Sequence, residues 1–306
     1  MLTTLLSAAP SSLPSWNPVD DINQILNYQF MRTALEAGTV VAIVAGVVGY
    51  FVVLRGLAFA GHALSHIGYA GATGAVLLGL PPFVGLLAFN IGAAGTMGAL
   101  GKRLYGRDVV IGVVMAFSLG LGQLFVTLYR GGGNSTESYS ILFGEVLGLT
   151  PQDLMRTVIT SAITLALVAL LYRRLLFASI DADVAEARGI RVRMLGLVFM
   201  AVLGLAVAQS VQVTGVLLIF ALLVAPAAIA QRASARPARA IALSVALAVG
   251  FVWAALACAF YMPYPVSFFL TAIAFATYLS ARAAATIRER VRRAEVIDPA
   301  AEGLAA

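Results

Sequence analysis

The chain has 306 residues, of which 61% are hydrophobic and only 11% are charged, and its formal net charge is +6. About a quarter of the residues of a soluble domain are charged, so this composition excludes a soluble globular protein and indicates a polytopic membrane protein. The basic residues lie in short loops between apolar runs, which favours cytoplasmic loops over a nucleic-acid partner as the origin of the positive charge.

At the N-terminus we expect a tail and an interfacial segment over 1–32, because the first residues carry no basic region of the kind that marks a signal peptide. Apolar residues at helical spacing predict an interfacial helix over 20–32. A transmembrane domain over 33–285 and a basic, cytoplasmic C-terminal tail over 286–306 complete the expected domain organisation.

The expected fold is all-α, a polytopic transmembrane helix bundle with eight or nine spans. Apolar stretches of about 20 residues recur along the chain, and each is long enough to cross a hydrocarbon core of roughly 30 Å. The expected spans are 33–54, 57–80, 83–100, 109–128, 154–177, 194–210, 213–230, 240–261 and 266–284. Nine crossings would put the N-terminus outside and the C-terminus in the cytoplasm, unless the segment before the first span also enters the membrane.

Local features of these spans carry further predictions. Glycines recur every third residue over 92–101, which predicts a groove where a neighbouring helix approaches closely. Thr150 and Pro151 have the residue types of an N-cap and a first helical position, and together they predict the start of the fifth span. Polar residues at 209–212 are expected to separate the sixth span from the seventh, and Pro226 predicts a kink within the seventh.

A charged segment between the fifth and sixth spans has the pattern of a short capped helix. Asp181 is its expected start, Asp183 and Glu186 are the acids near that start, and Gly189 is its expected end. A helix held at the cytoplasmic face of a membrane can be moved by a partner protein. A solvated connector is the alternative interpretation.

The two histidines of the chain, His62 and His66, lie four positions apart in the second span. Helical geometry places them one turn apart on one face, where both imidazoles can bind one ion. Polar side chains among apolar helices are costly, so the pair indicates a functional site, with interhelical hydrogen bonding as the structural alternative. Neutral imidazole suits zinc, copper, nickel and iron(II), and two nitrogens are too few for a closed structural zinc site. We therefore expect an incomplete, exchangeable site that suits passage of the metal.

Enzyme functions find little support in the sequence. The glutamate of the His-Glu-x-x-His motif is missing after His62, and neither a Gly-x-Ser-x-Gly nor a phosphate-binding Gly-x-x-x-x-Gly-Lys motif is apparent. The single cysteine, Cys258, excludes a cysteine-based metal cluster. We expect a transport subunit that relies on a separate ATPase and binds no permanent cofactor, with the metal ion as its cargo.

With these motifs in view, the chain resembles the permease subunits of the bacterial ABC importers for zinc, manganese and iron(II). The resemblance covers about 38–278. The runs that carry it are FVVLRGLAFAGHALSH at 51–66, FGEVLGLTPQDL at 143–154, DADVAEARG at 181–189 and VTGVLLIFALLVAPAA at 213–228.

This resemblance implies an all-helical permease of the bacterial inner membrane that pairs with a second copy of itself. Its further implied partners are two cytoplasmic ATPase subunits, an extracytoplasmic metal-binding protein and membrane lipid, with no nucleic acid. The charged segment would then be the coupling helix, with Asp181, Asp183, Glu186 and Gly189 as its coupling residues. Gly215 and Pro226 in the last run are the expected gating and kink positions.

At one position the histidine pair departs from the family pattern. His66 matches the family's histidine, whereas His62 stands where the family usually has aspartate. Replacing a carboxylate by an imidazole removes a hard oxygen ligand and favours zinc, with manganese or iron next. Candidates for further ligands are Ser65, Gln123, Glu145 and Gln209. The alternative functions are a permease for a chelated metal, of the siderophore or cobalamin type, and a membrane channel without an ATPase.

Overall fold

The structure is a computed structural model that describes residues 18–100, 107–129, 144 and 146–302. These residues form helices and short connections, and no strand occurs among them. The helices are α2 (Pro18–Asn27), α3 (Gln29–Leu54), α4 (Ala58–Leu77), α5 (Pro82–Leu100), α6 (Arg107–Tyr129), the 3-10 turn η3 (Val146–Gly148), α8 (Pro151–Ile180), α9 (Ala182–Ala187), α10 (Val192–Thr214), α11 (Val216–Ala233), α12 (Pro237–Tyr261) and α13 (Val266–Glu302).

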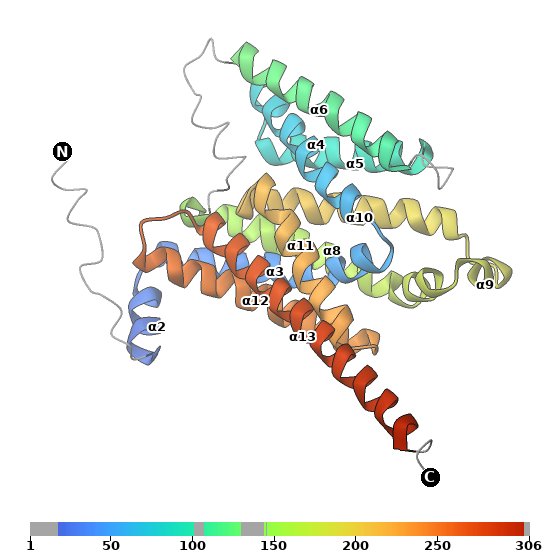
Figure 1. Ribbon diagram of the computed structural model, residues 1–306. Helices are drawn as coiled ribbons and strands as arrows, with labels where there is room; N and C mark the ends of the chain where they lie inside the picture. The colour runs from blue at the N-terminus through green and yellow to red at the C-terminus, as the bar shows by residue number, and fades with distance from the viewer. Residues whose placement is uncertain (1–17, 101–106, 130–143, 145, 303–306) are drawn as a thin grey trace.

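The lengths of these helices confirm the expected transmembrane bundle. Six helices, namely α3, α6, α8, α10, α12 and α13, are long and apolar enough to cross a membrane, and α5 and α11 are shorter apolar helices. With α4, which carries both histidines, they correspond to the nine expected spans. Figure 1 shows α2 and α9 at opposite ends of this bundle, with α4, α5 and α6 grouped beside α10.

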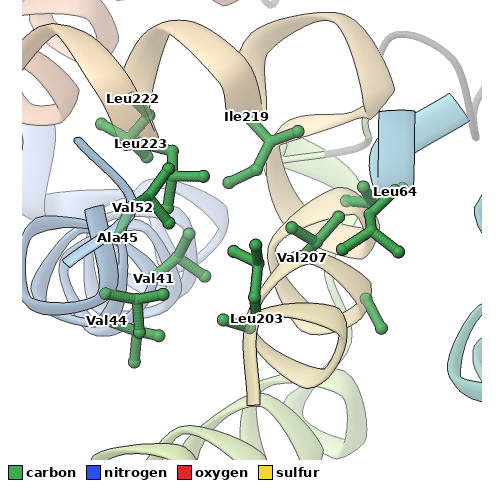
Figure 2. Close-up of a cluster of buried hydrophobic side chains, with 14 of the residues drawn as sticks. Val41, Val44, Ala45, Val52, Leu64, Leu203, Val207, Ile219, Leu222 and Leu223 are labelled. Carbon is green, nitrogen blue, oxygen red and sulfur yellow. The ribbon is translucent and has the colours of Figure 1, made fainter. Parts of the chain in front are cut away.

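Helix α3 lies at the centre of the bundle and contacts α8, α10, α11 and α12. Its buried side chains join those of α4, α10 and α11 in one apolar cluster, part of which is shown in Figure 2. The labelled residues are Val41, Val44, Ala45, Val52, Leu64, Leu203, Val207, Ile219, Leu222 and Leu223. This cluster fixes α4, the histidine helix, against the core.

A close helix crossing at Gly49 gives a test of this packing. A Cβ at Gly49 would meet the backbone carbonyl of Leu223 in α11. Since backbone atoms cannot move aside as a flexible side chain can, we expect Gly49→Val to destabilise the bundle by about 3 kcal/mol, which lowers the thermal midpoint by roughly 6–12 °C. The control is Gly250→Val, because a Cβ at Gly250 would meet nothing within 4 Å. Equal midpoints for the two variants in detergent would contradict this packing.

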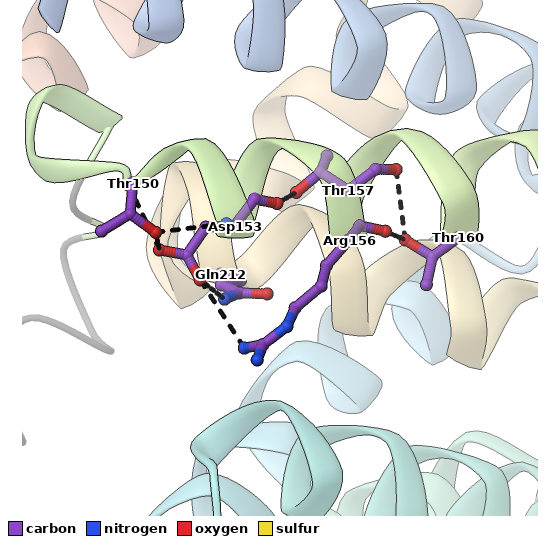
Figure 3. Close-up of polar contacts among 6 residues, drawn as sticks. All are labelled: Thr150, Asp153, Arg156, Thr157, Thr160 and Gln212. Atoms are coloured by element: carbon purple, nitrogen blue, oxygen red, sulfur yellow. Dashed lines mark hydrogen bonds and ion pairs between the residues drawn. The ribbon is translucent and has the colours of Figure 1, made fainter.

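The start of α8 confirms the prediction made from Thr150 and Pro151. Thr150 Oγ1 accepts a hydrogen bond from the Asp153 backbone N–H, and Asp153 Oδ2 accepts one from the Thr150 N–H, both at 3.2 Å. This reciprocal arrangement is a capping box. Figure 3 shows that the Asp153 carboxylate also faces Arg156, with which it forms an ion pair at 3.8 Å, and Gln212 of α10.

Two expected helix boundaries were wrong. The helix expected over 20–32 ends at Asn27, because Tyr28 adopts an extended backbone (φ −91°, ψ 122°) and its ring packs against Phe260 of α12. The break expected at 209–212 is absent, and α10 continues to Thr214. These polar residues remain helical because their side chains find partners: Gln212 donates to Asp153 at 3.3 Å, and Ser210 donates to its own helix at Ala206.

Among the four glycines of 92–101, the two whose surroundings the structure describes, Gly92 and Gly95, do not make the close helix contact that the sequence predicted. A Cβ at Gly92 or Gly95 would meet nothing within 4 Å, whereas α5 approaches α4 closely at Gly85 instead. Gly101 lies outside the described residues. At the C-terminus, α13 runs on to Glu302, so the basic segment expected from 286 continues the helix of the last span.

Candidate metal site

His62 and His66 lie in α4 one turn apart, and both side chains are half-buried. Their ring centroids are 4.6 Å apart and the ring planes meet at 83°. This edge-to-face arrangement puts both imidazoles on the same side of the helix, as their spacing predicted. We call these two residues the histidine pair.

The side chain of His62 contains a buried atom that has no hydrogen-bond partner. Its Nδ1 has no such partner among the described residues, although it is removed from solvent. The ring packs against Phe220 of α11, with centroids 5.0 Å apart. Leaving a buried polar atom unpaired is costly, and neutral imidazole nitrogen is a common metal ligand. The unpartnered nitrogen is therefore suited to bind a metal ion.

Few other ligating groups accompany the histidine pair. No group of three or more His, Cys, Asp or Glu side chains that could hold a metal occurs in the described part of the chain. The Ser65 hydroxyl donates to the His62 backbone carbonyl at 2.6 Å. Gln123 is exposed on α6, and Glu145 lies outside the described residues. The fourth candidate, Gln209, is fully buried in α10 and accepts a hydrogen bond from Ser161 of α8 at 3.3 Å.

The segment after α8 folds as the short helix α9 that its charge pattern predicted. Asp181 caps it, because its Oδ1 accepts a hydrogen bond from the Val184 N–H at 2.9 Å. Asp183 and Glu186 are exposed, whereas Ala185 between them is buried. Gly189 follows the helix with a φ of +81°, a left-handed conformation that glycine adopts without strain. Helix α9 thus presents its acids outward and is anchored to the bundle by Ala185.

The two expected gating positions lie in and beside α11. Gly215 joins α10 to α11 with φ 83° and ψ 163°, a region of backbone conformation that is essentially restricted to glycine. Gly144 abuts this joint, since a Cβ there would lie 2.5 Å from the carbonyl carbon of Thr214. Pro226 lies within α11, which extends without a break from Val216 to Ala233.

Two contacts around the site were not foreseen from the sequence. Phe220 packs against His62, and Arg55 lies over the ring of Phe199 in α10. Both contacts join residues more than 140 positions apart, a separation that helical periodicity does not connect. An aromatic residue on an apolar helix and an arginine at a span end carried no signal of a specific partner.

Comparisons with known proteins place these features in a family. The family described as "ABC 3 transport family" matches residues 27–285. The manganese transport system membrane protein MntC of Listeria monocytogenes is 35% identical over 207 residues, which cover 67% of this chain and 73% of that protein. The manganese import system permease protein ScaB of Streptococcus gordonii is 30% identical over 230 residues, covering 75% and 82%.

Solved structures show a similar fold. A chain of the structure described as PsaBC from Streptococcus pneumoniae in complex with Fab matches with a TM-score of 0.77 and 29% identity, and the match covers 86% of this chain and 94% of that one. A chain of an inward-facing, putative metal-chelate type ABC transporter matches with a TM-score of 0.69 and 17% identity over 92% of this chain. At that identity the second likeness shows the fold alone.

Proposed function

Because the chain belongs to the ABC 3 transport family, we propose that it is the membrane-spanning permease subunit of an ATP-driven importer for a divalent transition-metal ion. The observation that carries this proposal is the histidine pair, with rings 4.6 Å apart and a buried His62 nitrogen that lacks a hydrogen-bond partner among the described residues. The metal is cargo, which an incomplete site can release.

The remaining parts of the transporter follow from this proposal. A separate ATPase, in two copies, hydrolyses ATP and acts on α9, an extracytoplasmic protein delivers the metal, and a second copy of the chain completes the membrane part. The multi-pass bundle then lies in a bacterial plasma membrane with α9 and the C-terminal end of α13 in the cytoplasm. Basic residues in two places support this orientation, namely Arg173 and Arg174 in α8 shortly before α9, and Arg232, Arg236 and Arg239 around the connection between α11 and α12.

We propose zinc as the preferred metal. Two imidazole nitrogens favour zinc over manganese, since manganese prefers carboxylate, carbonyl and water oxygens. Manganese is the second candidate, because the similar permeases named above are described as manganese transporters. The two candidate metals predict different effects of replacing His62 by aspartate, the residue that the resemblance implies at this position.

Metal selectivity tests both the function and the metal. The permease, reconstituted with its ATPase, should take up zinc in preference to manganese when ATP is present. His62→Asp should lower the zinc-to-manganese uptake ratio on the order of tenfold, equivalent to about 1.4 kcal/mol of differential binding, because a carboxylate restores a hard oxygen ligand.

Other results would favour the other candidate functions. A wild-type preference for manganese that His62→Asp leaves unchanged would assign manganese and remove the selectivity role of His62. Metal flux without ATP would indicate a channel. Uptake of a metal chelate but not of the free ion would indicate a chelate permease.

A further inference from the structure

The connection between α3 and the histidine helix is short and tightly bonded. Arg55 ends α3, Gly56 turns with a φ of +63°, and the Leu57 N–H donates back to Val52 O at 2.8 Å. Helix α4 begins at Ala58, so His62 lies seven positions after Arg55. We call residues 55–57 the elbow. A displacement of the elbow must displace the first turn of α4, because α4 begins at the residue that directly follows the elbow.

The side chain of Arg55 contacts two other helices. Its Nη1 lies 3.5 Å from Ser179 Oγ in the last turn of α8. Its guanidinium carbon lies 5.5 Å from the centre of the Phe199 ring in α10, within the range of a cation–π contact. A Cβ at Gly196, also in α10, would lie 3.6 Å from Nη2. One side chain therefore reaches both α8 and α10.

Helices α8 and α10 precede and follow α9 in the chain, and we call them the two arms of α9. Ser179 lies two positions before Asp181, the N-cap of α9, and Gly196 lies in the second turn of α10 on the other side of α9. The packing around this contact is dense, since Phe51 is fully buried and meets Phe199 and Tyr172 edge-to-face at 6.1 and 6.0 Å. Residues of the last turn of α3 are thus fixed to both arms of α9.

We propose that Arg55 is a positioning residue that transmits the movement of α9 to the histidine pair. Its guanidinium contacts both arms of α9, and its backbone continues through the elbow into the start of α4. This inference rests on the proposed function. Arginine suits the role because its planar guanidinium can donate to a hydroxyl and stack on a ring at the same time, whereas a lysine ammonium is a point charge.

The test measures metal ions transported per ATP hydrolysed by the permease reconstituted with its ATPase. We expect Arg55→Gln to lower this ratio about tenfold and to leave equilibrium metal binding without nucleotide unchanged, because the guanidinium contacts described above are with Ser179 of α8 and Phe199 of α10. Arg55→Lys should give an intermediate ratio. The control, Arg239→Gln, removes an exposed arginine near the start of α12 and should leave the ratio at the wild-type value.

Several outcomes would overturn the proposal. One is a wild-type ratio of metal transported to ATP hydrolysed in Arg55→Gln. Another is a low ratio in Arg55→Gln together with a wild-type ratio in Arg55→Lys, because that pattern would indicate that only a positive charge at the membrane surface is needed. Equal loss of metal binding and transport would indicate a structural role. If Arg55→Gln does not accumulate, we compare Ser179→Ala, Arg55→Lys and the double variant. Two residues that act through one contact should have non-additive effects on the ratio, so additive effects would contradict the proposal. Absence of uptake by the wild-type complex would instead refute the proposed function.

Discussion

Replacing both His62 and His66 by alanine should abolish ATP-driven metal uptake by the reconstituted complex. Loss of an outer-shell partner of a metal ligand alone lowers metal affinity by about 10–100-fold, so removing both imidazoles should lower uptake by about 100-fold or more. The bundle should remain folded, because alanine favours the helical conformation and neither ring is fully buried. Radioactive zinc uptake, normalised to the amount of permease in the membrane, gives the measurement.

Thr73→Ala is the matched control for the histidine variants. Thr73 lies in the same helix, two turns beyond His66, and its hydroxyl donates to Tyr69 O at 3.0 Å and to Ala70 O at 3.1 Å. The Thr73→Ala variant therefore loses hydrogen bonds that lie within α4, and its metal uptake should stay near the wild-type value. Uptake that survives the double alanine replacement in protein of normal amount would show that the histidine pair is a packing feature.

Substitution of Gly189 is expected to uncouple ATP hydrolysis from transport. The φ of +81° at this position is strained for a side chain with a Cβ, and the strain is greatest for a β-branched residue. No atom lies within 4 Å of a Cβ placed there, so the effect would come from the backbone alone. Gly189→Val should tilt or fray the end of α9, and the metal transported per ATP should fall about tenfold.

Two further variants isolate this effect. Gly189→Asn should retain coupling, because asparagine tolerates the left-handed region. Glu186→Lys reverses an exposed charge on α9 without a change of backbone and should also reduce coupling if the ATPase contacts this face. ATPase rate and metal uptake are measured on the same vesicles, and an unchanged ratio in Gly189→Val would mean that α9 is a connector only.

The fold was largely predictable because each helix that crosses a membrane must appear in the sequence as a long apolar run. Apolar runs gave the spans, and Thr150 and Asp181 marked helix starts by local bonds over three residues. The errors arose where a distant helix supplies the partner. Gln212 was expected in a break between helices, yet Asp153 of α8 accepts its hydrogen bond at 3.3 Å, and this partner is 59 positions away.

The candidate site was predictable only in its local part. The spacing of His62 and His66 was enough to place both imidazoles on one side of a helix, because four positions make about one turn. The contact of His62 with Phe220 depends on how α4 and α11 are arranged, and the contact of Arg55 with Ser179 depends on how the end of α3 meets α8. No sequence motif around the residues of either contact indicates which distant residue is the partner.

The polar links between α8 and α10 restrict how these helices can move. Gln212 donates to Asp153 and Ser161 donates to Gln209, each at 3.3 Å. Sliding one helix along the other by a single residue, about 1.5 Å, would take both bonds beyond hydrogen-bond range, whereas apolar contacts can shear by small steps. These two bonds couple α8 to α10, with α9 between them, so we expect the two helices to move together.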